Sequence, residues 1–200
     1  MLRLAIAGGL CSGKSTVAGI LREHGVPVAD ADALGHALLP AAASELAAKL
    51  GQGILDAGGG IDRRRLAERV FTAPQDEAAA ARAILNAVMH PRIMAATERE
   101  LQAWQAQGYA IAGVDAALLI EAGLLAGFDQ VWLVTAPEPV RVARYVARGG
   151  TPEQAQARIA AQWPDARKRP WAQVVIDNGG TLAATRAQVE RALAELPVRQ

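Results

Sequence analysis

Residues 8–15 read Gly-Gly-Leu-Cys-Ser-Gly-Lys-Ser and match the pattern G-x-x-x-x-G-K-[ST]. Glycines in such a loop let backbone N–H groups surround a phosphate, and the helix that follows directs the positive end of its dipole at the anion. The side chain of Lys14 can reach the β- and γ-phosphates of a nucleotide, and the hydroxyl of Ser15 can bind Mg²⁺. This stretch, called the phosphate loop below, predicts a nucleoside triphosphate site.

The flanking sequence has the order that this motif requires. An apolar run from Leu2 to Ala7 precedes the loop and is typical of a buried strand. Val17, Ile20 and Leu21 follow at helical spacing, and Gly25 is a suitable C-terminal stop for that helix. The alternative, a glycine-rich turn beside an unrelated lysine, does not account for this strand, loop and helix order.

The composition indicates a single protein domain with room for inserted subdomains. The chain has 200 residues, 52% hydrophobic residues and a net charge of +1, so no global field recruits nucleic acid or a membrane, and we expect neither partner. Cys11 is the only cysteine, which excludes an intrachain disulfide and fits a reducing compartment. Residues 1–7 are too short for the apolar region of a signal peptide, so we expect a cytoplasmic location.

A second strand is expected at residues 26–29, and it ends in Asp30-Ala31-Asp32. Ligands of open α/β sheets collect beyond the carboxyl ends of the strands, which brings these carboxylates near the phosphate loop. Alternation would place Asp30 and Asp32 on one side if the strand persists, and a turn would break that relation. Asp32 can serve as the base that a kinase needs, or it can cap a helix that starts near Ala33.

Residues 33–108 predict several helices and little strand. Residues 51–60 contain five glycines and form a loop, in which Asp56-Ala57-Gly58-Gly59 matches a GTPase D-x-x-G pattern by chance. Asp62 opens a helix with an apolar stripe at Leu66, Val70 and Phe71. The arginines at 63–65 fan around that helix, so one can bind an anion while the others are solvated. His90-Pro91 is expected to interrupt the next helical stretch.

Strands return in the second half of the chain, at residues 109–115, 130–135 and 174–176. Continuous apolar strands alternating with helices predict a parallel sheet covered on both faces, hence an α/β fold. Asp115 ends one of these strands, where an aspartate can orient Mg²⁺ through water. Glu121 follows and can contact a substrate or cap a helix.

Three arginines at helical spacing, Arg141, Arg144 and Arg148, predict one positively charged helix face. A Gly149-Gly150 break follows, and then a new helix with Thr151 as its N-cap. Two helices joined by glycines can form a lid that closes arginines over a transferring phosphate. The alternative is a solvated face.

Taken together, residues 3 to about 193 resemble the dephospho-CoA kinase family. The resemblance rests on the order and spacing of several short motifs. They are the phosphate loop, Asp-Ala-Asp at 30–32, Asp62-Arg63 with Val70-Phe71, His90-Pro91, Leu118-Leu119 with Glu121, Arg144 with Arg148, residues 158–162 and Ile176-Asp177-Asn178-x-Gly180.

This resemblance implies a P-loop NTPase three-layer fold with a parallel five-stranded sheet, a helical insert and a helical lid. The core would comprise 1–32, 109–136 and 171–200, the insert that holds the CoA substrate 33–108, and the lid 137–170. The implied reaction is transfer of the ATP γ-phosphate to the ribose 3′-hydroxyl of dephospho-CoA, with Mg²⁺, in a monomer or small homo-oligomer.

The resemblance also assigns roles to individual residues. Asp32 would be the base, with Lys14 and Arg144 as the other catalytic residues, and Ser15 would bind the metal. Asn178 is expected to lie near the nucleobase of ATP. Other contacts to ATP are expected from Gly9, Leu10, Cys11, Ser12, Gly13, Lys14, Ser15, Thr16 and Arg144. Substrate contacts are expected from Asp32, Arg63, His90, Leu118 and Glu121.

Five positions depart from the pattern expected of the family. Cys11 stands where the family pattern has glycine, and His36 stands where it has arginine. Likewise, Ala117 replaces proline, Arg141 replaces glutamine and Gln173 replaces aspartate. Two other functions share some of these features. Another small-molecule or nucleotide kinase would differ in what the 33–108 insert accepts. A GTPase-type switch would need an N-K-x-D motif, which the sequence does not contain.

Overall fold

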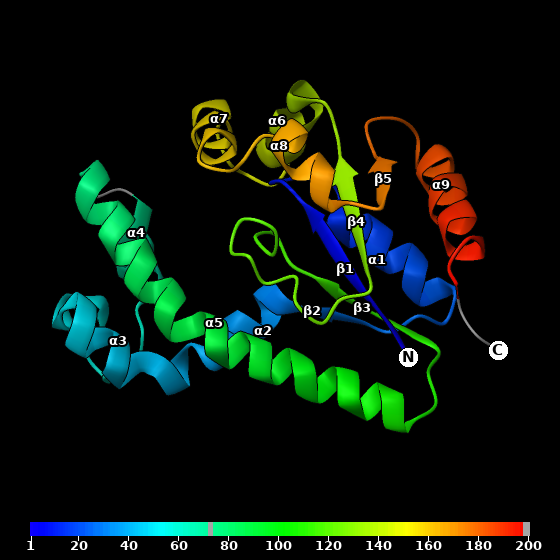
Figure 1. Cartoon of the computed structure of the whole chain (residues 1–200). Coiled ribbons are helices and arrows are strands. Elements are labelled where there is room, and N and C mark those ends of the chain that lie inside the picture. Colours follow the sequence, from blue (N-terminus) through cyan, green and yellow to red (C-terminus); the bar gives the residue numbers. More distant parts are fainter. Residues whose placement is uncertain (72–73, 198–200) are drawn as a thin grey trace. The chain divides into compact units, whose positions relative to one another are not determined.

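The computed structural model describes residues 1–71 and 74–197 (Figure 1). Its backbone contacts divide the chain into two compact units, one of residues 1–30 with 100–200 and the other of residues 31–99. The expected insert, residues 33–108, shares 33–99 with the second unit. The expected lid, residues 137–170, is part of the first unit.

The first unit contains a five-stranded sheet in which every neighbouring pair is parallel. The strands are β1 (Leu2–Gly8), β2 (Val28–Asp30), β3 (Ile111–Asp115), β4 (Gln130–Thr135) and β5 (Val174–Asp177). They lie in the order β2-β3-β1-β4-β5. The predicted parallel five-stranded α/β architecture is confirmed.

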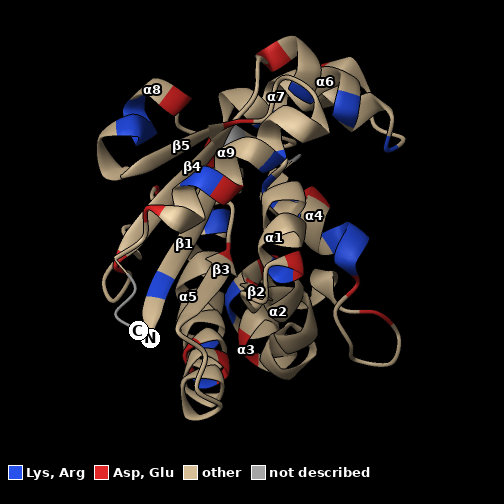
Figure 2. Cartoon of the chain, turned by 90° about the vertical axis from the view of Figure 1, so that its right-hand side faces the viewer, with Lys and Arg blue, Asp and Glu red and all other residues tan. Residues whose placement is uncertain are grey.

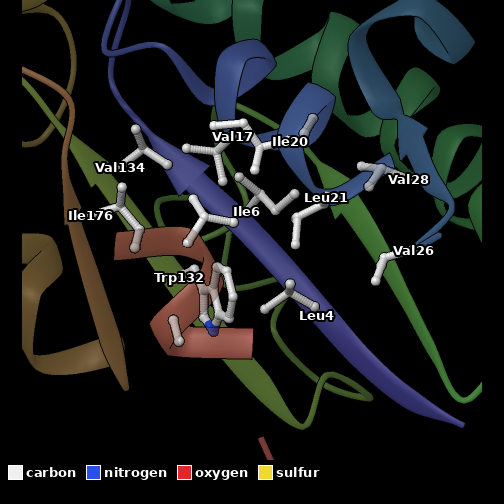
Figure 3. Packing of buried hydrophobic residues seen from close by; sticks show 13 residues of the cluster. Leu4, Ile6, Val17, Ile20, Leu21, Val26, Val28, Trp132, Val134 and Ile176 are labelled. Atoms are coloured by element: carbon white, nitrogen blue, oxygen red, sulfur yellow. The ribbon is translucent and has the colours of Figure 1, made fainter. Parts of the chain in front are cut away.

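β1 occupies the centre of the sheet, with β3 on one side and β4 on the other. Leu4, Ala5 and Ile6 have no exposed surface, which explains why the strand reads as an unbroken apolar run. Two helices, α1 (Lys14–Glu23) and α9 (Leu182–Ala194), pack their apolar residues against the sheet. Figure 3 shows the resulting core around Ile6 and Trp132.

The helices of the lid region also belong to the first unit. They are α6 (Glu138–Val146), α7 (Pro152–Ala160), α8 (Asp165–Lys168) and the 3₁₀ turn η3 (Arg169–Trp171). The predicted start of α7 is confirmed, because the Thr151 hydroxyl accepts from the Gln154 N–H while the Gln154 side chain accepts from the Thr151 N–H. Charges of both signs lie on α8 (Figure 2).

The second unit is helical, as predicted for this part of the sequence. Its elements are α2 (Ala31–Leu38), η1 (Pro40–Ala42), α3 (Ala43–Leu50), η2 (Gln52–Ile54), α4 (Arg63–Phe71) and α5 (Gln75–Ala106), whose last residues belong to the first unit. Leu46, Val70 and Val88 are among the buried residues of its own core. Within 31–71 and 74–99, the structure has one isolated bridge, between Leu55 and Ile61, and no strand.

Two expectations for this helical region are wrong. α5 runs through Pro91 without a break. Buried residues on both sides of the proline, Val88 and Met89 before it and Ala96 after it, hold the helix against neighbouring apolar groups, and this packing outweighs the lost N–H bond. Phe71, predicted to belong to an apolar stripe, is 57% exposed because it is the last residue of α4.

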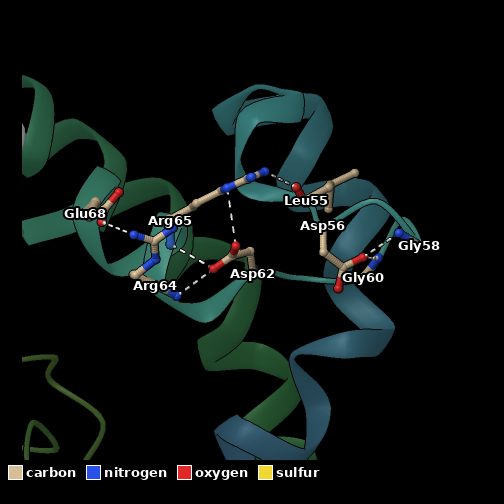
Figure 4. A network of polar contacts seen from close by, with 8 residues as sticks. All are labelled: Leu55, Asp56, Gly58, Gly60, Asp62, Arg64, Arg65 and Glu68. Carbon is tan, nitrogen blue, oxygen red and sulfur yellow. Dashed lines mark hydrogen bonds and ion pairs between the residues drawn. The ribbon is translucent and has the colours of Figure 1, made fainter.

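Aspartates organise the loop between η2 and α4 (Figure 4). One oxygen of Asp62 accepts from the N–H groups of Arg64 and Arg65, which caps α4. Asp56 accepts from the N–H groups of Gly58 and Gly60. The Asp-x-x-Gly match therefore serves a local turn, in agreement with its interpretation as chance.

In residues 1–71 and 74–197, no helix is long and apolar enough to cross a bilayer.

Candidate active site

The phosphate loop connects the central strand directly to a helix. β1 ends at Gly8 and α1 begins at Lys14, so the loop lies at the carboxyl edge of the sheet. Within the loop the Ser12 N–H donates to the Gly9 carbonyl, at 3.2 Å. The positive end of the α1 dipole therefore faces the turn, as a phosphate site requires.

Gly13 makes the turn into α1 possible. Its φ is +98°, a left-handed conformation that L side chains rarely adopt. A Cβ built on Gly13 would overlap the side-chain amide of Asn178. Glycine at this position thus serves both the loop conformation and the close approach of a side chain from the end of β5.

Cys11 is also left-handed, with a φ of +54°. Among residues 1–71 and 74–197, it is the only non-glycine residue with a positive φ. The residue is partly exposed, and its thiol forms no disulfide. The departure from glycine noted in the sequence therefore falls at a position where glycine would carry no steric strain.

Two side chains hold the second half of the loop by its carbonyl groups. Arg144, on α6, donates through Nη1 to the carbonyls of Cys11 (3.3 Å) and Ser12 (3.2 Å) and through Nη2 to that of Asn178 (2.7 Å). The Asn178 amide donates to the Ser12 carbonyl at 2.8 Å, and its oxygen accepts from Thr185 on α9 at 2.9 Å. The loop is thus attached to α6 and, through Asn178, to α9.

The first half of the loop is held by two residues that the sequence did not assign to the site. Arg141 Nε donates to the Leu10 carbonyl, and Gln162 Oε1 accepts from the Leu10 N–H, both at 2.8 Å. The spacing of Arg141 from Arg144 was a usable signal, since both lie on one helix face. Arg148 lies beyond the end of α6 and is exposed, so the predicted face of three arginines is reduced to two.

The acidic candidates follow different strands. Asp115 is the last residue of β3 and is in register with Asp30, the last residue of β2, and with Ile6 of β1. Asp32 lies in the first turn of α2, because the strand ends at Asp30. Alternation along a strand therefore does not apply to Asp30 and Asp32. Asp32 is not the N-cap either, because α2 already begins at Ala31.

The residues expected to bind the substrate are divided between the two units. Arg63 is exposed at the start of α4, and His90 is half-buried within α5 in the second unit. Burial lowers the pKa of the His90 imidazole below its ordinary value. Leu118 is 41% exposed in the turn after β3, and Glu121 forms a buried ion pair with Lys168 in the first unit.

The arginines that open α4 have different surroundings (Figure 4). Arg64 lies 3.8 Å from Glu68, and Arg65 pairs with Asp62 at 3.3 Å and donates to the Leu55 carbonyl at 2.7 Å. Within the described part of the chain, Arg63 makes no ion pair. Of the three, Arg63 is the one whose charge is not directed at a neighbouring residue.

Comparison with known proteins identifies the family. The family model for dephospho-CoA kinase matches residues 2–184. The chain belongs to the dephospho-CoA kinase family. A dephospho-CoA kinase of Deinococcus radiodurans is 41% identical over 199 residues, covering 98% of this chain and 93% of that protein. Members of this family are ATP-dependent kinases, and so is this chain.

Solved structures agree with the fold. A crystal structure from Thermus thermophilus shares 35% identity with a TM-score of 0.81, covering 98% of this chain and 97% of that one. A dephospho-CoA kinase from Campylobacter jejuni shares 24% identity with a TM-score of 0.61, covering 96% of each, and supports the fold alone.

In this member of the dephospho-CoA kinase family, protein side chains bind two carbonyl groups of the phosphate loop. Arg141 donates to the Leu10 carbonyl, and Arg144 and Asn178 donate to the Ser12 carbonyl. Among the described residues no group of three or more His, Cys, Asp or Glu side chains is arranged to hold a metal ion.

Proposed function

We propose that this chain transfers the γ-phosphate of ATP to the ribose 3′-hydroxyl of dephospho-CoA, forming coenzyme A and ADP. One observation carries the proposal: a phosphate loop, turned by left-handed Gly13 into α1, stands at the centre of a parallel sheet in a chain that the family model matches over residues 2–184. In this reaction the 3′-oxygen bonds to the γ-phosphorus while the bond to the β–γ bridging oxygen breaks.

The phosphate loop would hold the nucleotide. The backbone of residues 9–16 and the side chain of Lys14 would bind the phosphates of ATP, and the Ser15 hydroxyl would bind Mg²⁺, with Asp115 orienting the ion through water. When bound, Mg²⁺ supplies positive charge that neutralises the phosphate oxygens. The position of Ser15 in the first turn of α1 supports this assignment, because the loop precedes this turn and the positive end of the helix dipole lies there.

Asp32 would accept the proton of the attacking hydroxyl. Its place supports this role, since α2 begins directly after β2 and the first turn carries the carboxylate just beyond the carboxyl end of a strand. The competing role is structural, because an acidic side chain in the first turn of a helix is stabilised by the helix dipole.

The helical insert would bind the CoA part of the substrate. Arg63 supports this proposal, since its charge is available for a substrate phosphate while Arg64 and Arg65 interact with their neighbours. His90, Leu118 and Glu121 would complete the substrate contacts. The ion pair between Glu121 and Lys168 favours a role for Glu121 in holding the turn after β3.

Residues 137–170 would act as the lid, with Arg144 placing charge over the transferring phosphate. We further propose that the enzyme works in the cytoplasm, as a monomer or a small homo-oligomer, without nucleic acid or membrane as a partner. The single cysteine and the balanced net charge support this setting.

A coupled assay for ADP release tests the proposed function. The purified chain would be given Mg²⁺ and ATP with dephospho-CoA, AMP, adenosine or no acceptor. We expect turnover with dephospho-CoA alone, with coenzyme A as product. Turnover with another acceptor would assign the insert to a different small-molecule kinase, and ADP release that does not depend on any acceptor would contradict the proposal.

A further inference from the structure

Arg141 is a buried arginine that ion pairing does not account for. Its side chain is 8% exposed, and a carboxylate oxygen of Asp165 lies 3.9 Å from Nη1. The closer contact is to backbone: Nε donates to the Leu10 carbonyl at 2.8 Å. Removing a guanidinium from water is costly, so a buried arginine needs a compensating interaction. Here that interaction is the hydrogen bond to the phosphate loop.

Both backbone polar groups of Leu10, the N–H and the carbonyl, form hydrogen bonds to side chains. The Gln162 side chain, just past the end of α7, accepts from the Leu10 N–H, while Arg141 on α6 donates to the Leu10 carbonyl. A Cβ built on Gly9 would overlap Arg141 Nη2 and would lie 3.1 Å from Gln162 Oε1. Glycine at position 9 therefore lets both lid side chains reach the loop.

Holding a carbonyl also orients the next N–H group. In a planar trans peptide the C=O of one residue and the N–H of the following residue point in opposite directions. Arg141 on the Leu10 carbonyl therefore turns the Cys11 N–H away from α6. Arg144 and Asn178 act in the same way on the Ser12 carbonyl and so orient the Gly13 N–H. The Ser12 N–H already donates to the Gly9 carbonyl within the loop.

We infer that Arg141 is a positioning residue of the phosphate loop: through the Leu10 carbonyl it fixes the peptide whose N–H, that of Cys11, binds nucleotide phosphate. Together with Gln162 it makes the lid part of the structure that keeps the loop ready for ATP. The inference rests on the proposed function for its ligand, the phosphates of ATP. It is particular to this chain, since glutamine is the residue expected here from the family pattern.

The first test measures the affinity for MgATP by titration calorimetry in wild type and in Arg141→Met, which keeps an unbranched apolar stem and removes the guanidinium donors. A loop that must be ordered by the ligand binds more weakly, so we expect the Kd to rise about 10-fold, as for the loss of one hydrogen bond to a charged group. Arg191→Met, an exposed arginine on α9, is the matched control and should leave the Kd unchanged.

Steady-state kinetics separate positioning from chemistry and from folding. Saturating ATP should restore the loop in Arg141→Met, so the KM for ATP should rise about 10-fold while kcat stays within about 2-fold. Arg141→Gln keeps a donor and should fall between wild type and Arg141→Met. A lower kcat with unchanged ATP affinity, or a lower Tm with unchanged Kd, would overturn the inference.

A double-mutant cycle adds a readout that general destabilisation would not produce. Arg141→Met and Gln162→Leu release the same residue, Leu10, so their effects on the Kd for MgATP should combine to less than the product of the single effects. Independent effects would contradict a shared action on Leu10. If the wild type fails to use dephospho-CoA, the proposed acceptor is wrong, while these MgATP measurements still decide the role of Arg141.

Discussion

Lys168 Nζ lies 2.7 Å from Glu121 Oε1, and the lysine side chain has no exposed surface. The pair connects α8, at the end of the lid region, to the turn that follows β3. Each charge makes the burial of the other tolerable, and neither would be stable there alone. Lys168 is one of only three lysines in the chain, and Lys14 of the phosphate loop is another.

Replacing Lys168 by methionine should destabilise the protein strongly. The variant leaves the Glu121 carboxylate, 13% exposed, without its cation, which typically costs about 3–5 kcal/mol. Denaturant unfolding of Lys168→Met and of Lys168→Met with Glu121→Leu would measure the effect. We expect the double variant to recover much of the loss. Equal stabilities of wild type and Lys168→Met would show that the pair contributes nothing.

Asp32→Asn tests the proposed base. The amide cannot accept the proton, so we expect kcat to fall by about 10²- to 10⁴-fold, with little change in the Kd for MgATP. Asp30→Asn, at the neighbouring strand end, should have a much smaller effect on kcat. Comparable losses of kcat and of ATP affinity in Asp32→Asn would instead make Asp32 a structural residue of α2.

Cys11→Gly should raise the melting temperature. At a φ of +54° a side chain costs about 1–2 kcal/mol, partly offset by the greater freedom of glycine in the unfolded chain. A net gain of about 1 kcal/mol corresponds to about 2–4 °C for a chain of this size. Cys11→Ala keeps the strain and removes the thiol, and thermal unfolding should show no such gain for it. A higher Tm for Cys11→Ala than for Cys11→Gly would contradict the explanation by strain.

Protonation of His90 should make the fold less stable in mild acid. Burial lowers the pKa of the folded imidazole below 6.5, so the unfolded chain takes up its proton at a higher pH than the folded chain does. Stability from this group is therefore complete above pH 6.5 and is lost as the pH falls below it. Thermal unfolding between about pH 5 and 8 should show a smaller decline for His90→Gln than for wild type. His36→Gln, at an exposed position, is the control, and equal slopes for all three proteins would refute the role of His90.

The sequence predicted the elements whose signals are local. The phosphate loop, the apolar strand before it and the capping box at Thr151 depend on neighbouring residues, and all three were located correctly. Pro91 was misread because the packing of Val88 and Met89, which keeps α5 continuous, involves residues distant in the sequence. Single-sequence patterns contain no information on such contacts.

The candidate site likewise contains residues with local sequence signals and residues whose contacts are distant in the sequence. The motif predicts roles for Lys14 and Ser15, which stay predictions. Helical spacing singled out Arg144 together with Arg141 and Arg148, and the structure shows Arg144 bonded to the loop. Gln162 could not be assigned to the loop, because its contact with Leu10 spans 152 residues. The proposed roles of Asp32 and Arg63 rest on family resemblance and remain predictions, since the groups that they would contact belong to the substrate and not to the chain.

The bond between Asn178 and the Ser12 carbonyl has a consequence for synthesis of the chain. A ribosome makes the phosphate loop well before the residues that support it: β1 has no partner strand until residues 111–115 or 130–135 are made, and the loop lacks its support until residues 178–185 follow. Nascent chains that stop before this point should be unable to retain nucleotide. Translation thus completes the support of the phosphate loop only after residue 185 has been added.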